Sequence, residues 1–163
     1  MQAWIRTSAL DPMGILVKSP PILHEPGDKL LGLNHTASKI GLDHGWVGYL
    51  AGVTSINDAT WHQVTWTQQR DVSGSQERWI LYVDGMEESR LNISTSADIS
   101  THTLRVGGRS PGSYFDGFFD GSIDEVQIQN IAITPAWITT AFCNQSAPAS
   151  FVRVGTEEVL GSR

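Results

Sequence analysis

Apolar and polar residues alternate in short runs along most of this chain. In Trp61–Gln68, for example, Val64 and Trp66 share one face. A period of two predicts a β-strand with one buried side. The same pattern, bounded by Gly, Pro, Asn, Asp and Ser, predicts further strands at Ala3–Thr7, Ile15–Val17, Lys29–Asn34, Lys39–Asp43, Trp46–Ala51, Arg78–Asp84, Met86–Ile93, Thr103–Val106, Ile123–Gln129 and Phe151–Val154.

One segment has helical character. Thr134 suits the N-cap and Pro135 the first position of a helix over Thr134–Ala141. Asp84 and Gly85 predict a two-residue hairpin turn between neighbouring strands. Ten or eleven short strands at this spacing, with one short helix, predict an all-β antiparallel sandwich or barrel.

Strand parity also predicts which side chains fill the core. We expect seven residues to be buried between two sheets: Trp66, Leu81, Val83, Leu104, Val106, Val126 and Ile128. Large aromatic side chains often anchor such cores. Four tryptophans fit that role: Trp4, Trp61, Trp66 and Trp79.

Composition narrows the class of protein. The chain has 163 residues, which suits one domain, and charged residues make up only 17%, against about 25% in an average soluble domain. The surface is therefore rich in small polar residues, a composition common in extracellular β proteins. A net charge of −6 argues against nucleic-acid binding, and no apolar run approaches the roughly 20 residues of a membrane span. The one cysteine, Cys143, excludes an internal disulfide.

Several pieces of the chain, in order, resemble one family. The pieces are Ala3–Arg6, Trp61–Val64, Leu81–Gly85, Leu104–Gly108 and Phe119–Val126. They resemble laminin-G-like domains of the concanavalin A-like lectin and glucanase type, as found in large bacterial surface proteins. The resemblance implies a jelly-roll β-sandwich of two curved antiparallel sheets over residues 1–155, a polar tail over residues 156–163, and an extracellular or cell-surface location.

Domains of that family are mostly binding modules. The favoured function is therefore a non-catalytic, lectin-like module that binds a glycan. A structural or adhesive module of a cell-surface protein is the alternative, and an atypical glycosidase is a third. The glucanases that share the sandwich carry their carboxylates as Glu-x-Asp-x-Glu on one strand, and no such triplet occurs here. We therefore expect no enzymatic activity.

Exposed aromatic rings are the candidate sugar contacts, because their flat apolar faces stack on sugar rings. Tyr82 alternates away from Leu81 and Val83, so we expect it on the outer face of its sheet. Its expected neighbours at the sugar site are Trp46, Tyr49 and Tyr114. The alternative is that these rings pack under loops.

Asp124 is the candidate metal ligand. It shares the strand parity of Val126 and Ile128, so we expect it to face the core, where a carboxylate needs hydrogen bonds or a metal. Asp120 and Asp116 add oxygen donors of the kind that Ca²⁺ prefers. Related sandwiches hold a structural Ca²⁺ near the matching strand, so the resemblance also implies calcium. The alternative is that Asp124 accepts backbone N–H bonds in a β-bulge.

The start of the chain bears on its assembly. Family members usually have one more strand before the strand at Ala3, and that strand pairs near Ile123–Gln129. Its apparent absence predicts an open sheet edge, and an open edge recruits another chain unless it is covered. We expect either a homodimer through this edge or a cover formed by Phe151–Val154.

Overall fold

The computed structural model describes residues 1–34, 38–71, 73–95, 101–151 and 155. The elements in this part of the chain are β1 (Gln2–Arg6), β2 (Met13–Ser19), β3 (Lys29–Leu33), β4 (Lys39–His44), β5 (Gly48–Ser55), β6 (His62–Arg70), β7 (Gln76–Val83), β8 (Met86–Ser94), β9 (Thr103–Val106), β10 (Ser122–Gln127), α1 (Pro135–Ser146) and α2 (Pro148–Phe151). The predicted strands before residue 130 are all present, with boundaries shifted by a few residues.

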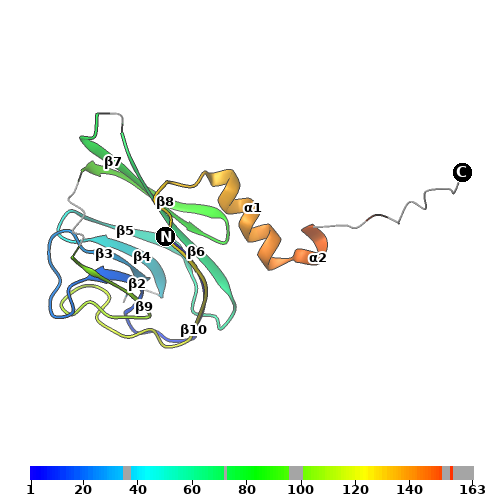
Figure 1. Cartoon of the computed structure of the whole chain (residues 1–163). Coiled ribbons are helices and arrows are strands. Elements are labelled where there is room, and N and C mark those ends of the chain that lie inside the picture. Colours follow the sequence, from blue (N-terminus) through cyan, green and yellow to red (C-terminus); the bar gives the residue numbers. More distant parts are fainter. Residues whose placement is uncertain (35–37, 72, 96–100, 152–154, 156–163) are drawn as a thin grey trace, which may run out of the picture.

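The strands form two five-stranded sheets (Figure 1). Sheet A has the order β10-β1-β6-β7-β8, and sheet B has the order β5-β4-β3-β2-β9. Every pairing between these strands is antiparallel. The predicted jelly-roll sandwich with a short C-terminal helix is confirmed.

The core lies between the inner faces of the two sheets. Trp66, Leu81 and Val83 are buried there, as predicted. Most of the other core side chains come from the middle of each sheet, among them Ala3, Ile5, Ile15, Leu16, Leu31, Leu33, Ile40, Leu42, Val64 and Trp79. The alternation in the central strands therefore reports their burial correctly.

At one side of the sandwich the core predictions are wrong. Leu104 and Val106 in β9, and Val126 and Ile128 in and after β10, are exposed. These two strands end their sheets, and the opposite end strands, β5 and β8, contact each other. β9 and β10 thus lie along the other side of the sandwich, where an end strand has a neighbour on one flank only.

The C-terminal end of the chain also departs from prediction. Phe151 belongs to α2 and not to a strand, and residues 152–154 and 156–163 lie outside the described residues. The helix α1 begins as predicted, with Thr134 as N-cap accepting a hydrogen bond from the Trp137 backbone N–H. It continues five residues beyond Ala141, because its last turns pack on sheet A. Within the described residues, no helix has the length and apolar character to cross a membrane.

The β7–β8 turn fixes the geometry beside α1. Asp84 and Gly85 both have positive φ, as the predicted two-residue hairpin turn requires. The Asp84 carboxylate accepts hydrogen bonds from the Gln63 backbone N–H (2.9 Å) and from the His62 Nδ1 (2.7 Å), and so ties the turn to the start of β6. Thr139 of α1 donates its hydroxyl to the Gly85 carbonyl (2.9 Å), which places the helix against the same turn.

Candidate functional site

The outer face of sheet B is filled by the protein's own loops. Strand register places Val17, Leu30, Asp43 and Tyr49 in one row on this face. Phe115, from the loop after β9, is fully buried against Val17 and Leu30. A Cβ on Gly32 would lie 2.7 Å from the Phe115 ring, so the missing side chain there makes room for it. The trough that an open sheet would offer to a ligand is therefore occupied.

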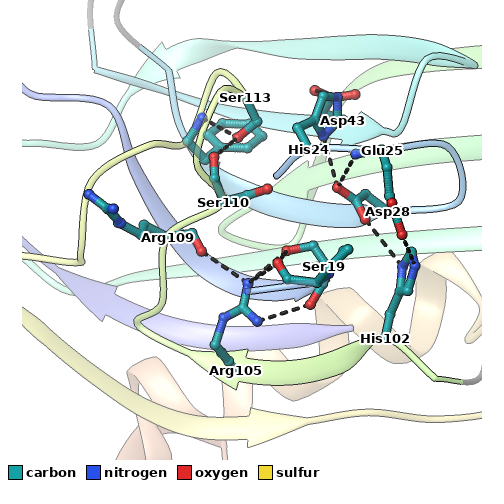
Figure 2. Close-up of polar contacts among 12 residues, drawn as sticks. Ser19, His24, Glu25, Asp28, Asp43, His102, Arg105, Arg109, Ser110 and Ser113 are labelled. Atoms are coloured by element: carbon teal, nitrogen blue, oxygen red, sulfur yellow. Dashed lines mark hydrogen bonds and ion pairs between the residues drawn. The ribbon is translucent and has the colours of Figure 1, made fainter. Parts of the chain in front are cut away.

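A cluster of titratable side chains, most of them buried, holds a second loop on the same face (Figure 2). The His24 ring lies 2.9 Å from Asp28 and 3.4 Å from Asp43, and His102 lies 2.8 Å from Glu25 and 3.2 Å from Asp28. Burial raises the pKa of Asp28 and raises the pKa of Asp43 to about 6. These contacts bind residues 24–28 to β4 and to His102.

The four predicted sugar-binding aromatics do not form one group. Tyr82 is only 2% exposed, so the prediction that it faces solvent is wrong. It lies on the outer face of sheet A, which carries α1, whereas the other three residues belong to sheet B or its loops. Trp46 is 75% exposed and Tyr114 is 50% exposed. The Tyr114 ring packs on the half-buried Tyr49, with ring centroids 4.9 Å apart.

The three predicted calcium ligands do not converge. Asp124 is exposed and shares a face with Trp4, its partner in β1, so the prediction that it points into the core is wrong. Its Oδ1 accepts the Glu125 backbone N–H (2.8 Å), as in the bulge alternative. Asp116 and Asp120 are also exposed. Among the described residues, no three His, Cys, Asp or Glu side chains are arranged to hold a metal ion.

A hollow of about 490 Å³ lies on the outer face of sheet A, between the strands and the end of α1. We call it the tryptophan hollow. Its lining residues are Trp4, Trp61, Asp124, Glu125, Asn144, Gln145, Ser146 and Pro148. Two indoles, two carboxylates and two amides thus surround one opening, although they come from four separate segments of the chain.

The two tryptophans have different roles in this hollow. Trp61 lies just before β6 and is 40% exposed, so its indole is available to a ligand. The Arg6 guanidinium lies 5.2 Å from the centroid of the Trp61 ring and supports it. Trp4 is 9% exposed, and its indole N–H donates a 2.6 Å hydrogen bond to Gln145 Oε1. Trp4 therefore holds Gln145 in place beside the hollow, and Trp61 presents an exposed ring to a ligand.

The two carboxylates sit on an irregular piece of β10. Glu125 has a φ of 49°, in the left-handed region that few residues other than glycine adopt. The β1–β10 register shifts at the same point, between Gln2 and Trp4. Bulges of this kind redirect side chains and are common beside binding sites. Here the bulge places Asp124 and Glu125 together at the rim of the hollow.

Sequence parity contains the signal for this site, but the prediction that Trp61 is a core anchor is wrong. Trp61 is out of step with the inward Val64 and Trp66, and Trp4 is out of step with the inward Ala3 and Ile5. Both tryptophans therefore belong to the outer face of sheet A. The part played by Asn144 and Gln145 has no sequence signal, because it depends on how α1 packs.

The family model described as the concanavalin A-like lectin/glucanases superfamily matches residues 1–139. The chain belongs to this family. No curated protein matches the sequence. The match to this family model confirms the resemblance to laminin-G-like domains at the level of the family.

Several solved structures share the fold at low sequence identity. The CBM40 of the Ruminococcus gnavus IT-sialidase is 15% identical, with a TM-score of 0.65 over 86% of this chain and 80% of that one. A heptameric SAP-like pentraxin from Limulus polyphemus is 16% identical, with a TM-score of 0.60 over 88% and 69% of the two chains. Domains LG4-5 of the mouse laminin alpha1 chain are 18% identical, with a TM-score of 0.56 over 83% and 36%. At such identities the likeness shows the fold alone.

Proposed function

We propose that this domain is a non-catalytic, lectin-like module that binds a glycan in the tryptophan hollow. The observation that carries the proposal is the exposed indole of Trp61 beside four polar side chains, Asp124, Glu125, Asn144 and Gln145. An indole offers an apolar face for a sugar ring, and carboxylates and amides exchange hydrogen bonds with hydroxyl groups. The volume of about 490 Å³ lies within the usual range of small-molecule sites.

The comparisons support the same class of function. The CBM40 neighbour has also been solved bound to α2,3- and α2,6-sialyllactose. A glycan-binding module of this family works outside the cell, so we propose a secreted or cell-surface location. Because fold alone does not determine function, the proposal rests on the hollow.

A glycan array followed by calorimetric titration of the positive glycans tests the proposal. Trp61→Ala should abolish binding while leaving the folded state intact, since Trp61 is not part of the core. Trp137→Ala is the matched control, because Trp137 is also an exposed tryptophan but does not line the hollow. Binding that survives Trp61→Ala would place the glycan elsewhere.

The second candidate location is the aromatic group on sheet B. It is favoured by the exposure of Trp46 and Tyr114 and by the contact of Tyr114 with Tyr49. Loss of binding in Tyr114→Ala, with retention in Trp61→Ala, would assign the site to this face.

Two other functions have distinct outcomes. A structural or adhesive module would give an empty glycan array and would bind a protein of the cell surface. An atypical glycosidase would release reducing ends from a β-glucan or a similar polysaccharide. We expect no release, because no Glu-x-Asp-x-Glu triplet is present on any strand. We also propose self-association through the outer edge of β10, with which no strand in the described part of the chain pairs. Calcium binding remains a prediction.

A further inference from the structure

We infer that the tryptophan hollow selects neutral sugars and rejects acidic ones, an inference that rests on the glycan-binding function proposed above. Asp124 and Glu125 are both exposed at its rim, and among the described residues that line it none is Lys, Arg or His. The chain as a whole carries a formal charge of −6. A sugar with a carboxylate or sulfate group would therefore enter a site with two like charges and no cation among the described lining residues.

One described cation beside the hollow, Arg6, is already engaged. The Arg6 guanidinium lies over the Trp61 ring at 5.2 Å and is 3.5 Å from the Ser122 hydroxyl. To pair with an acidic sugar it would have to leave the indole that supports stacking. An acidic glycan could therefore not gain both a stacking contact with the Trp61 ring as Arg6 supports it and a close ion pair with Arg6.

The remaining polar groups suit hydroxyl groups. Gln145 Oε1 accepts from both Trp4 Nε1 (2.6 Å) and Gln63 Nε2 (3.2 Å), so its amide orientation is fixed and its Nε2 remains a donor for a ligand. Behind it, Gln63 is 1% exposed, and its Oε1 has no hydrogen-bond partner among the described residues. The carboxylates of Asp124 and Glu125 accept O–H donors strongly, because hydrogen bonds to charged acceptors are strong.

This specificity separates the domain from its structural neighbour. The CBM40 of the sialidase has been solved with sialyllactose, which carries a carboxylate. The hollow described here would place two carboxylates, Asp124 and Glu125, beside such a ligand. On this inference the same fold would bind different sugars in the two proteins, because fold alone does not determine function.

The test is a calorimetric comparison of lactose, cellobiose and chitobiose, together with any neutral glycan found on the array, against α2,3-sialyllactose and digalacturonic acid. We expect the wild-type protein to bind one or more neutral sugars and to bind the acidic ones at least about tenfold more weakly at low salt. The double variant Asp124→Asn, Glu125→Gln keeps the shape and removes both charges. In this variant the difference in affinity between neutral and acidic sugars should be severalfold smaller. Added salt should reduce that difference in the wild type only.

The outcomes separate the two proposals. If the wild type binds sialyllactose as tightly as neutral sugars, and Trp61→Ala abolishes both, the specificity is wrong and the glycan-binding function stands. A difference that the double variant leaves unchanged also overturns the specificity. If no glycan binds, both proposals fail. Circular dichroism confirms that each variant is folded.

Discussion

The indole of Trp4 stacks on the phenyl ring of Phe142, with the ring centroids 5.7 Å apart and the planes 19° apart. This contact joins β1, the first strand of the chain, to the C-terminal part of α1. The same indole holds Gln145 through its N–H. One side chain of sheet A therefore both docks the helix and fixes an amide of the tryptophan hollow.

Phe142→Ala should loosen this arrangement. The half-buried ring contributes apolar burial and an aromatic pair, so we expect a loss of about 1–3 kcal/mol in the free energy of unfolding. Glycan affinity should fall as well, because Gln145 loses its fixed position. Urea denaturation and calorimetry measure the two effects. Thr140→Ala, an exposed change in the same helix, should alter neither.

Stability should depend on pH through His62. Its hydrogen bond to the Asp84 carboxylate (2.7 Å) raises the pKa of the imidazole, against the opposing effect of burial. A raised folded-state pKa means that the native protein holds the proton more tightly. The resulting stability is fully present below the unfolded pKa of about 6.5 and is lost as pH rises through the folded value.

Urea unfolding of the wild type and of His62→Gln at several pH values between 6 and 9 measures this effect. The difference between the two proteins should shrink by about 1 kcal/mol as pH rises, because the variant has no imidazole to titrate. A difference that stays constant over this range would show that the ion pair with Asp84 adds nothing to stability. Taking the difference removes the contributions of all other titrating groups.

The central strands could be predicted from the sequence because each has neighbours on both flanks. In such strands parity alone decides burial, as for Trp66, Leu81 and Val83. At β9 and β10 the same pattern fails, since no element among the described residues buries Val106 or Ile128. Sequence alternation records that a residue faces one side, and the topology decides whether that side is covered.

The site was less predictable because it depends on how α1 covers sheet A and on the β-bulge at Glu125. Tyr82 has the predicted outward parity, but its face carries α1 and is not open to solvent. The break in register at Glu125 turns Asp124 away from the core, and no local pattern specifies it. The parity of Trp61 could have been recognised, but the partners that make it a site come from the packing of a distant helix.

Calcium binding by Asp124, Asp120 and Asp116 remains a prediction, and the positions of these residues give it no support. Ca²⁺ takes six to eight oxygen ligands around one point, whereas these exposed carboxylates do not converge. If they bind Ca²⁺, excess CaCl₂ should raise the melting temperature and excess EDTA should lower it, because a ligand selective for the native state stabilises that state. A melting temperature that is the same under both conditions would remove the calcium prediction.

The outer edge of β10 should support weak self-association. In the described part of the chain no strand pairs with it, and Ile128 beside it is exposed. A second hollow of about 490 Å³ opens here, with Leu104, Ile128 and Ile131 in its lining. Asp124 and Glu125 protect one half of the strand by repulsion, so pairing is confined to the other half.

Sedimentation velocity over a range of protein concentrations should reveal this dimer. Ile128→Lys should give a monomer at every concentration, because charge at an edge opposes pairing. Met86→Lys is the control, since Met86 is also an exposed apolar residue and lies in β8, at the other end of sheet A. A wild-type protein that is monomeric throughout would contradict the proposal.

Tyrosine variants distinguish the two faces of the sandwich. Tyr82 is buried, so Tyr82→Ala should cost about 3–5 kcal/mol of stability, and any loss of glycan binding in it would follow from unfolding. Tyr82→Phe keeps the ring and loses only the hydroxyl, which is bonded to Thr67, so it should stay folded and retain glycan affinity.

Tyr114→Ala removes a half-exposed ring and should also retain affinity if the ligand binds in the tryptophan hollow. Retention in both folded variants, with loss in Trp61→Ala, is the result that the hollow requires. Loss in Tyr114→Ala alone would return the site to sheet B, where the glycan would have to bind at the rim, because Phe115 fills the trough.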